Sequence, residues 1–155
     1  MNRHLSRVII MQTLYEYDFR PEVDLDSIKQ RNIENYKEVS DNNFIDTSID
    51  LILNSLEEID AQIAKAAPEW PLDQISLIDK TILRIAIAEI LYTEDIPPKV
   101  AINEAVELGK TFGGQNSSKF INGVLGTVYR HSPRYNPEED EKAEKKHKTK
   151  EEKNG

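Results

Sequence analysis

The sequence predicts an all-α protein built from two small bundles of three helices each. Apolar residues recur three and four positions apart along most of the chain, which is the spacing of an amphipathic helix. Ile, Leu, Ala, Glu and Lys dominate, whereas there are only 6 Gly and 7 Pro. No stretch alternates apolar and polar residues as a half-buried strand would. At 155 residues the chain is long enough for one compact domain with a real core.

The first half of the chain predicts three helices. Residues 3–18 form the first, with Leu5, Val8 and Leu14 on a broad apolar surface that ends at Arg20-Pro21. A second, more polar helix is expected over residues 26–39. A long third helix is expected from a cap at Asp41 to Ala67, because its apolar positions alternate four and three apart, as in a coiled coil. These positions are Ile45, Ile49, Ile52, Leu56, Ile59, Ile63 and Ala66.

The second half predicts three more helices after a rigid connector at residues 68–71. Residues 73–93 are apolar nearly all round, so this helix should be central. Pro98 is well placed to open a helix over 99–112, and Gly113-Gly114 should end it with a left-handed cap. Ser117 should cap the last helix, on which Gly123 and Gly126 would let a neighbour approach closely. The two bundles are thus expected over about 1–67 and 72–133.

Residues 134–155 are expected to be a disordered, charged tail. From Pro137 onward the sequence EEDEKAEKKHKTKEEKNG has almost no apolar residue. Such a segment cannot bury enough surface to offset the entropy of ordering it. A solubilising role is the expected one, although its lysines could add weak contacts to RNA.

Composition excludes several classes of protein. The chain has no Cys, so it has no disulfide, thiolate zinc site or cysteine nucleophile, which fits a reducing cytoplasm. No apolar run approaches the roughly 20 residues that span a bilayer, so no membrane partner is expected. The three histidines lie far apart without metal-ligand spacing. Gly109-Lys110-Thr111 is not a phosphate loop, since position 104 is Glu104 instead of the required Gly. We therefore expect no enzyme activity, no metal and no cofactor.

Two segments predict contacts with nucleic acid despite a net charge of −8. The last helix begins with Ser117, Ser118, Lys119 and Phe120, and a helix N-terminus with a cation and a ring beside it suits a phosphate and a base. The first 15 residues carry two Arg and no acid. We expect these two segments to meet in one basic corner of an otherwise acidic molecule.

Each candidate residue also has a plain structural interpretation. Arg3 and Arg7, four apart on one helix face, could contact phosphates or could be two solvated surface arginines. Phe120 aligns with Val124 and Val128, which favours core packing, but its place in the first helical turn could leave an edge for base stacking. Tyr15 should be half core and half surface.

Three further residues leave the choice between local structure and binding open. Asn116 could contact RNA or satisfy local backbone groups in a turn. Lys80 and Arg84 are four apart and could extend the binding surface to RNA or a partner. They could equally pair with Asp79 or Glu89.

Three separated blocks of the sequence resemble the NusB family of transcription antitermination factors. They are RHLSRVIIMQTLY at 3–15, IDKTILRIAIAEIL at 78–91 and PKVAINEAVELGKTFGGQNSSKFINGVL at 98–125, in the order the family has them. The resemblance implies an all-helical fold of two three-helix bundles and a role without catalysis. It implies binding to the boxA element of nascent ribosomal RNA together with the ribosomal protein NusE, in a complex that helps RNA polymerase read through terminators.

The resemblance also implies which residues contact RNA. An arginine-rich first helix maps to Arg3, His4 and Arg7, followed by Gln12 and Tyr15. A second contact surface maps to Asn116, Lys119 and Phe120. Two alternatives remain: a helical protein–protein adaptor or homodimer that does not bind RNA, and a regulatory domain of an RNA-modifying enzyme.

Overall fold

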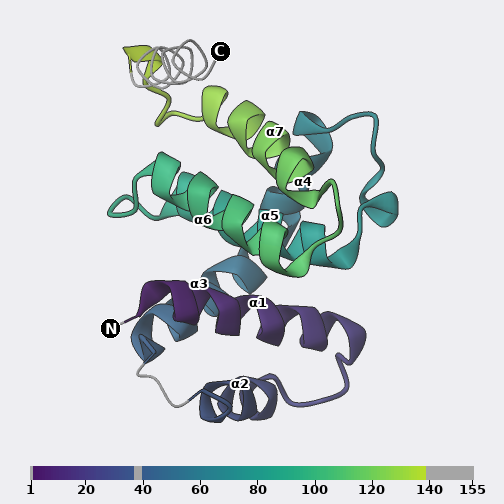
Figure 1. The fold of residues 1–155 in the computed structure, drawn as a ribbon, viewed down its shortest axis with the longest axis vertical. Helices are drawn as coiled ribbons and strands as arrows, with labels where there is room; N and C mark the ends of the chain where they lie inside the picture. Colours follow the sequence, from purple (N-terminus) through teal and green to yellow (C-terminus); the bar gives the residue numbers. More distant parts are fainter. Residues whose placement is uncertain (1, 37–39, 139–155) are drawn as a thin grey trace, which may run out of the picture.

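The computed structural model describes residues 2–36 and 40–138 and is all-helical there, as predicted (Figure 1). Within these residues no helix is both long and apolar enough to cross a lipid bilayer. The elements are α1 (Arg3–Phe19), α2 (Leu25–Glu34), α3 (Asn42–Asn54), α4 (Leu56–Ala66), the short 3-10 helix η1 (Leu72–Gln74), α5 (Leu77–Tyr92), α6 (Pro98–Phe112) and α7 (Ser117–Arg130).

The first bundle consists of α1, α2 and α3, and side-chain caps begin two of these helices, α1 and α3. Asn2 caps α1 by accepting a hydrogen bond from the backbone N–H of Leu5 at 2.9 Å. Asp41 caps α3 by accepting one from Phe44 N–H at 3.1 Å. The hydroxyl of Ser6 accepts a hydrogen bond from Asp41 N–H at 2.8 Å, which ties the start of α3 to α1.

The prediction of one long third helix is wrong, because the helix is interrupted at Ser55. Ser55 has φ −115° and ψ 16°, outside the helical region, and it separates α3 from α4. Ile45, Ile49 and Ile52 are buried on α3, which packs on α1 and α5. Ile59 and Ile63 are buried on α4, which packs on α5 and α7. The apolar residues of α3 and α4 pack against different helices. The interruption at Ser55 changes the direction of the chain so that α4 can pack on α5 and α7.

The second bundle therefore holds four helices, α4 to α7, instead of three. The division between the bundles falls at Ser55 and not at the connector of residues 68–71, because α4 packs within the second bundle. Figure 1 shows α1 lying against α5 between the two groups of helices. One continuous apolar core runs through both bundles.

Helix α5 is central, as its apolar sequence predicted, and contacts five other helices. It begins four residues later than expected, because residues 72–74 form a separate 3-10 turn. Ser76 caps α5 by accepting a hydrogen bond from Asp79 N–H at 3.2 Å. Nine of its residues are buried: Thr81, Ile82, Leu83, Ile85, Ala86, Ile87, Ala88, Glu89 and Ile90.

The turn between α6 and α7 needs its glycine for space and not for a left-handed cap. Gly113 has φ −88° and ψ −174°, an extended conformation that any residue can adopt. A Cβ at Gly113, however, would lie only 2.4 Å from the Cβ and Oγ of Ser117. Ser117 is the first residue of α7 and not its cap; Asn116 takes the cap position, and the Ser117 hydroxyl accepts a hydrogen bond from Gly114 N–H at 2.9 Å.

Close packing of α6 on α7 depends on Gly109 and not on the two glycines of α7. A Cβ at Gly109 would lie 2.9 Å from Cδ1 of Ile121. A Cβ at Gly123 would meet nothing within 4 Å, and one at Gly126 would first meet the side chain of Arg130 on the same helix. The predicted close approach at Gly123 and Gly126 is therefore wrong.

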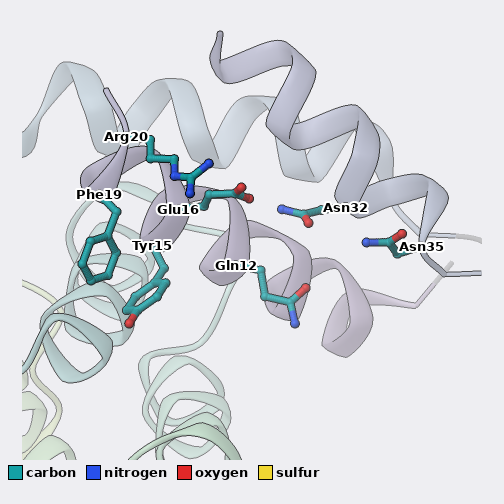
Figure 2. A pocket seen from close by; sticks show the side chains of 7 residues that line it. All are labelled: Gln12, Tyr15, Glu16, Phe19, Arg20, Asn32 and Asn35. Atoms are coloured by element: carbon teal, nitrogen blue, oxygen red, sulfur yellow. The ribbon is translucent and has the colours of Figure 1, made fainter. Parts of the chain in front are cut away.

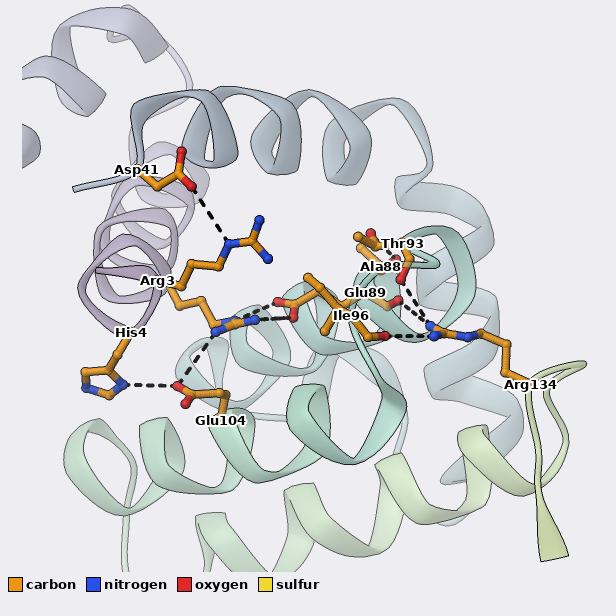
Figure 3. Close-up of polar contacts among 10 residues, drawn as sticks. Arg3, His4, Asp41, Ala88, Glu89, Thr93, Ile96, Glu104 and Arg134 are labelled. Atoms are coloured by element: carbon orange, nitrogen blue, oxygen red, sulfur yellow. Dashed lines mark hydrogen bonds and ion pairs between the residues drawn. The ribbon is translucent and has the colours of Figure 1, made fainter. Parts of the chain in front are cut away.

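The start of the predicted tail is ordered by Arg134. Its guanidinium donates hydrogen bonds to the backbone carbonyls of Glu89, Ile90, Thr93, Glu94 and Ile96, at 2.8–3.2 Å. Figure 3 shows this side chain reaching the end of α5 and the turn that follows it. The C-terminal carbonyls of α5 thus gain a charged donor. The remainder of the predicted tail, residues 139–155, lies outside the described residues.

One buried ion pair joins the two bundles, and a second ion pair lies within the second bundle. Arg7 on α1 is 4% exposed, and its Nε and Nη2 donate to the carboxylate of Glu89 on α5 at 2.8–3.2 Å. Arg84 on α5 forms a two-pronged pair with Asp60 on α4, with both distances 2.9 Å. Because Arg7 and Glu89 lie in different bundles, their pair sets how α1 sits on α5.

Replacing Gly113 by Ala should destabilise the protein by about 1–3 kcal/mol, because the added methyl has no room beside Ser117. Gly123→Ala is the matched control. It meets nothing within 4 Å and should be neutral or stabilising by up to about 1 kcal/mol, since Ala favours helix over Gly. Urea unfolding of both variants measures the difference, and equal stabilities would contradict the packing argument.

Breaking the Arg7–Glu89 pair on one side should cost about 3–5 kcal/mol, since it leaves a buried charge alone. Arg7→Met and Glu89→Leu should each show this loss in urea unfolding. The double variant should recover most of it, because no unpaired charge remains. A double variant as unstable as the sum of the two single variants would argue that the pair is not energetically coupled.

Candidate functional site

The predicted basic residues at the start of α1 are exposed only at Arg3 and His4. The Arg3 side chain is 44% exposed, lies 3.8 Å from the Asp41 carboxylate and covers the ring of Phe44 at 4.6 Å. Nδ1 of His4, whose side chain is 58% exposed, lies 3.0 Å from the carboxylate of Glu104 on α6 (Figure 3). Each of the two side chains thus already has an acidic neighbour, and both remain open to solvent.

Arg7 does not join them on that surface, which corrects the expected pairing of Arg3 and Arg7 on one exposed face. Its guanidinium is buried against Glu89, and Nη1 lies 4.0 Å from Glu104. A buried, two-pronged pair leaves this side chain no surface to offer a phosphate. Arg7 can act on a ligand only indirectly, by holding the helix that carries Arg3 and His4.

Gln12 and Tyr15 line an open cleft between α1 and α2, shown in Figure 2. Asn32 and Asn35 point into it from α2, whereas Tyr15 and Phe19 lie on another side of α1. Gln12 Oε1 accepts a hydrogen bond from the Tyr36 hydroxyl at 3.2 Å. Tyr15 is half-buried, as expected, and contacts Phe19 edge to face at 5.0 Å.

Phe19 and the remaining residues add hydrophobic and charged groups to this cleft. Phe19 is 63% exposed, which is unusual for a large apolar side chain. Glu16 pairs with Arg31, so its carboxylate is already bound. The cleft therefore presents amide groups, a phenol and an exposed ring, and its net charge is small.

A second cleft, of about 370 Å³, lies between the connector, the start of α5 and the start of α7. We call it the aromatic cleft. The rings of Trp70 and Phe120 line it, with centroids 6.5 Å apart and planes at 80°. The other lining residues are Gln74, Ile75, Ser76, Asp79, Gly114, Asn116 and Ser117. Two rings with polar groups around them form a surface on which a base or another flat ring can stack.

Two of the three predicted residues at the start of α7, Asn116 and Phe120, line this cleft, and Lys119 lies between them in the sequence. Phe120 packs partly on the core, which confirms the structural interpretation, and the rest of its ring lines the cleft; base stacking on it stays a prediction. Asn116 is exposed at the edge, and its side chain does not cap α7. Lys119 is exposed and forms no ion pair with any residue that the structure describes. Asn116, Lys119 and Phe120 thus supply an amide, a free cation and a ring.

Lys80 and Arg84 do not extend this surface. Lys80 donates to the backbone carbonyl of Leu72 at 3.4 Å, and Arg84 is committed to Asp60, with Asp18 at 4.0 Å. Neither pairs with Asp79 or Glu89, which were the partners considered from the sequence. The side chains of Lys80 and Arg84 thus connect elements of the fold.

The predicted residues therefore lie in three separate places, the start of α1, the cleft between α1 and α2 and the start of α7, and not in one basic corner. A helical rise of 1.5 Å per residue separates Arg3 from Tyr15 by about 18 Å. Arg3 and His4 lie at the start of α1, near α3 and α6. Asn116 and Phe120 lie by the connector and the start of α5. A ligand that touches both ends must be extended.

Sequence reasoning missed Trp70 and Asp79 as cleft residues. The sequence predicts only that Trp70 belongs to a rigid connector between Pro68 and Pro71, whereas in the structure its side chain is 51% exposed. A large aromatic residue held between two prolines and left half-exposed is a signal that could have indicated a binding surface. Asp79 was considered only as an ion-pair partner.

The described residues contain no group of three His, Asp or Glu side chains that could hold a metal ion. The clear pKa shifts lie elsewhere. A hydrogen bond to Glu58 raises the pKa of Tyr92 to about 12, and one to Asp46 raises the pKa of Lys29. The side chains that line the two clefts are amide, hydroxyl, carboxylate, guanidinium and aromatic groups, which can contact a ligand.

Comparison with known proteins agrees with this picture of the fold. The model of the NusB family matches residues 4–130. A transcription antitermination protein NusB of Chloroherpeton thalassium is 40% identical over 131 residues, covering 83% of this chain and 62% of that protein. One of Dehalococcoides mccartyi is 42% identical over 127 residues, covering 82% of this chain and 89% of that protein. The aligned region is thus slightly under two thirds of the first relative and most of the second.

Solved structures share the fold. NusB of T. maritima superposes with a TM-score of 0.76 at 32% identity, covering 85% of this chain and 93% of that one. A structure of antitermination factors NusB and NusE in complex with dsRNA has a chain with a TM-score of 0.73 at 23% identity, covering 83% and 96%. At that identity the second likeness concerns the fold alone. By its sequence match over residues 4–130, this chain belongs to the NusB family.

Proposed function

We propose that this protein is a transcription antitermination factor that binds single-stranded RNA of the boxA type in nascent ribosomal RNA. The RNA extends along α1 from Arg3 and His4, past Gln12 and Tyr15, to Asn116, Lys119 and Phe120. The protein performs no catalytic step. It acts in the cytoplasm, as part of the complex that keeps RNA polymerase transcribing through terminators.

The observation that carries this proposal is the arrangement at the start of α7. Lys119 is exposed without an ion pair among the described residues, although the chain as a whole carries a charge of −8. Beside it, Phe120 presents part of its ring to an open cleft. A free cation next to a ring provides one phosphate contact and one stacking surface, the two elements of single-strand recognition.

The family supports the partner. The relatives are transcription antitermination proteins, and one structural neighbour is a complex of NusB and NusE with dsRNA. We therefore propose that a NusE-type ribosomal protein binds beside the RNA face. A few phosphate contacts on an acidic body hold RNA weakly, and a second protein adds contacts and presents one composite surface.

The two ends of the face contribute differently. Arg3 and His4 each sit beside a carboxylate, Asp41 and Glu104, so part of their charge is already compensated. Lys119 forms no ion pair with any residue that the structure describes. Removing Lys119 should therefore weaken binding more than removing Arg3. Arg7 contributes by fixing α1 through Glu89 and not by touching the RNA.

Lys119→Ala and Arg3→Ala should each weaken binding to a boxA RNA and lower the slope of log affinity against log salt, by up to about 0.7 per lost phosphate contact. Arg130→Ala is the control, because it removes the same charge from an exposed position at the opposite end of α7. Fluorescence anisotropy over a series of salt concentrations measures the slopes. If Arg130→Ala changes affinity and slope as much as Lys119→Ala, the assigned contacts are incorrect.

Adding a NusE-type ribosomal protein should raise the affinity of the wild-type chain for boxA RNA, because the complex joins two sets of contacts. Titrations with and without the partner measure this gain, and a scrambled RNA of equal length is the control. Binding to the partner without RNA binding under any of these conditions would instead support a protein adaptor.

A further inference from the structure

We propose that Phe44 is a positioning residue for RNA binding: its ring orients the guanidinium of Arg3 and leaves the hydrogen-bond donors of that group free for a phosphate. This inference rests on the proposed RNA binding and names a residue that does not itself touch the RNA. It concerns the place where the first turn of α3 meets the start of α1.

Phe44 is held in place by both its side chain and its backbone. The side chain is 8% exposed and belongs to the apolar core. Its backbone N–H donates to Oδ1 of Asp41 at 3.1 Å, which is the capping bond that begins α3. Asp41 N–H in turn donates to the hydroxyl of Ser6 on α1 at 2.8 Å. The ring therefore has a fixed position relative to the helix that carries Arg3.

Two guanidinium groups of α1 lie over this ring. Cζ of Arg3 is 4.6 Å from the ring centroid, and Cζ of Arg7 is 5.3 Å from it. Both distances are within the roughly 6 Å at which a cation is attracted to an aromatic face. Arg7 is already fixed by its buried pair with Glu89. Arg3 is 44% exposed, so it is the group whose position the ring can decide.

The contact with the ring uses none of the N–H donors of Arg3. A guanidinium has five such donors, and two of them can meet a phosphate side by side. Arg7 spends its donors on Glu89. The Arg3 side chain, in contrast, donates no hydrogen bond to any described residue. Its one contact in Figure 3 joins Nε to the Asp41 carboxylate at 3.8 Å, which is too long for a hydrogen bond.

Orienting Arg3 before the RNA arrives should increase its contribution to binding. An arginine side chain loses rotamer freedom when it binds a phosphate, and a side chain that is already restricted loses less. A loose ion pair of a half-exposed arginine contributes little to this restriction, so the ring and not Asp41 is the main orienting group. We therefore assign the phosphate contact to Arg3 and its orientation to Phe44.

Side-chain NMR signals of Arg3 test the orientation in the absence of RNA. Protons over the face of an aromatic ring are shifted upfield by its ring current, so the Hδ and Hε signals of Arg3 should show this shift in the full chain. Phe44→Leu, which keeps a large apolar side chain, should remove the shift. Asp41→Asn is the matched control, because Asn also caps a helix but carries no charge, and it should retain the shift.

A double-mutant cycle tests the consequence for RNA. Phe44→Leu should weaken binding to a boxA RNA by about two- to fivefold, the factor that corresponds to one cation–π contact. Arg3→Ala should then cost much less affinity in the Phe44→Leu background than in the wild type, because the ring acts through Arg3. Lys119→Ala should cost the same in both backgrounds.

A further control separates orientation from a general loss of stability. Ile49→Val shortens another buried side chain of α3 and should leave both the Arg3 signals and the RNA affinity unchanged. Urea unfolding verifies that this variant and Phe44→Leu are folded under the conditions of the titrations.

The outcomes separate this inference from the proposed function. Arg3 signals without an upfield shift in the wild type overturn the inference, and so does a shift that Asp41→Asn removes as fully as Phe44→Leu. Equal costs of Arg3→Ala in the two backgrounds also overturn it, and all three results leave RNA binding itself standing. Absence of RNA binding in the wild-type chain overturns both.

Discussion

The buried pair of Arg7 and Glu89 is the constraint on which the arrangement of this molecule depends. Helix α1 must serve two bundles at once, packing on α2 and α3 on one side and on α5 on the other. A charged pair in that contact accepts only a narrow range of positions, because any slip would bury an unpaired charge. With α1 fixed in this way, Arg3 and His4 emerge at one end and Tyr15 at the other.

The second requirement is that α7 begins where the cleft needs it. Space at Gly109 lets α6 and α7 cross closely, and space at Gly113 lets the chain turn within a few residues. Together they bring Asn116 and Phe120 against Trp70 and the start of α5. The connector of residues 68–71, whose two prolines restrict its backbone, thus becomes one wall of a site.

Contacts within the fold use several arginine side chains, which lowers the positive charge available to a ligand. Three arginines of the fold are used internally: Arg7 and Arg84 in ion pairs between helices, and Arg134 on the carbonyls that end α5. Of the side chains proposed to contact a ligand, Arg3 and His4 each have an acidic neighbour. A nucleic-acid ligand of such a surface gains affinity from stacking and from a protein partner more than from total charge.

The sequence by itself determined the all-α class, most of the helix ends and the grouping of Asn116, Lys119 and Phe120, because helical periodicity, capping residues and nearness along the chain are local properties. It did not determine the break at Ser55, since one apolar stripe continues through α3 and α4 although they bury it in different cores. It did not show that Arg3 is exposed whereas Arg7, on the same helix, is buried. Nor did it show that Asp79 lines the same cleft as Trp70 and Phe120. Those facts depend on which helices meet, and only the tertiary structure decides that, because burial and pairing arise between residues that are distant in the chain.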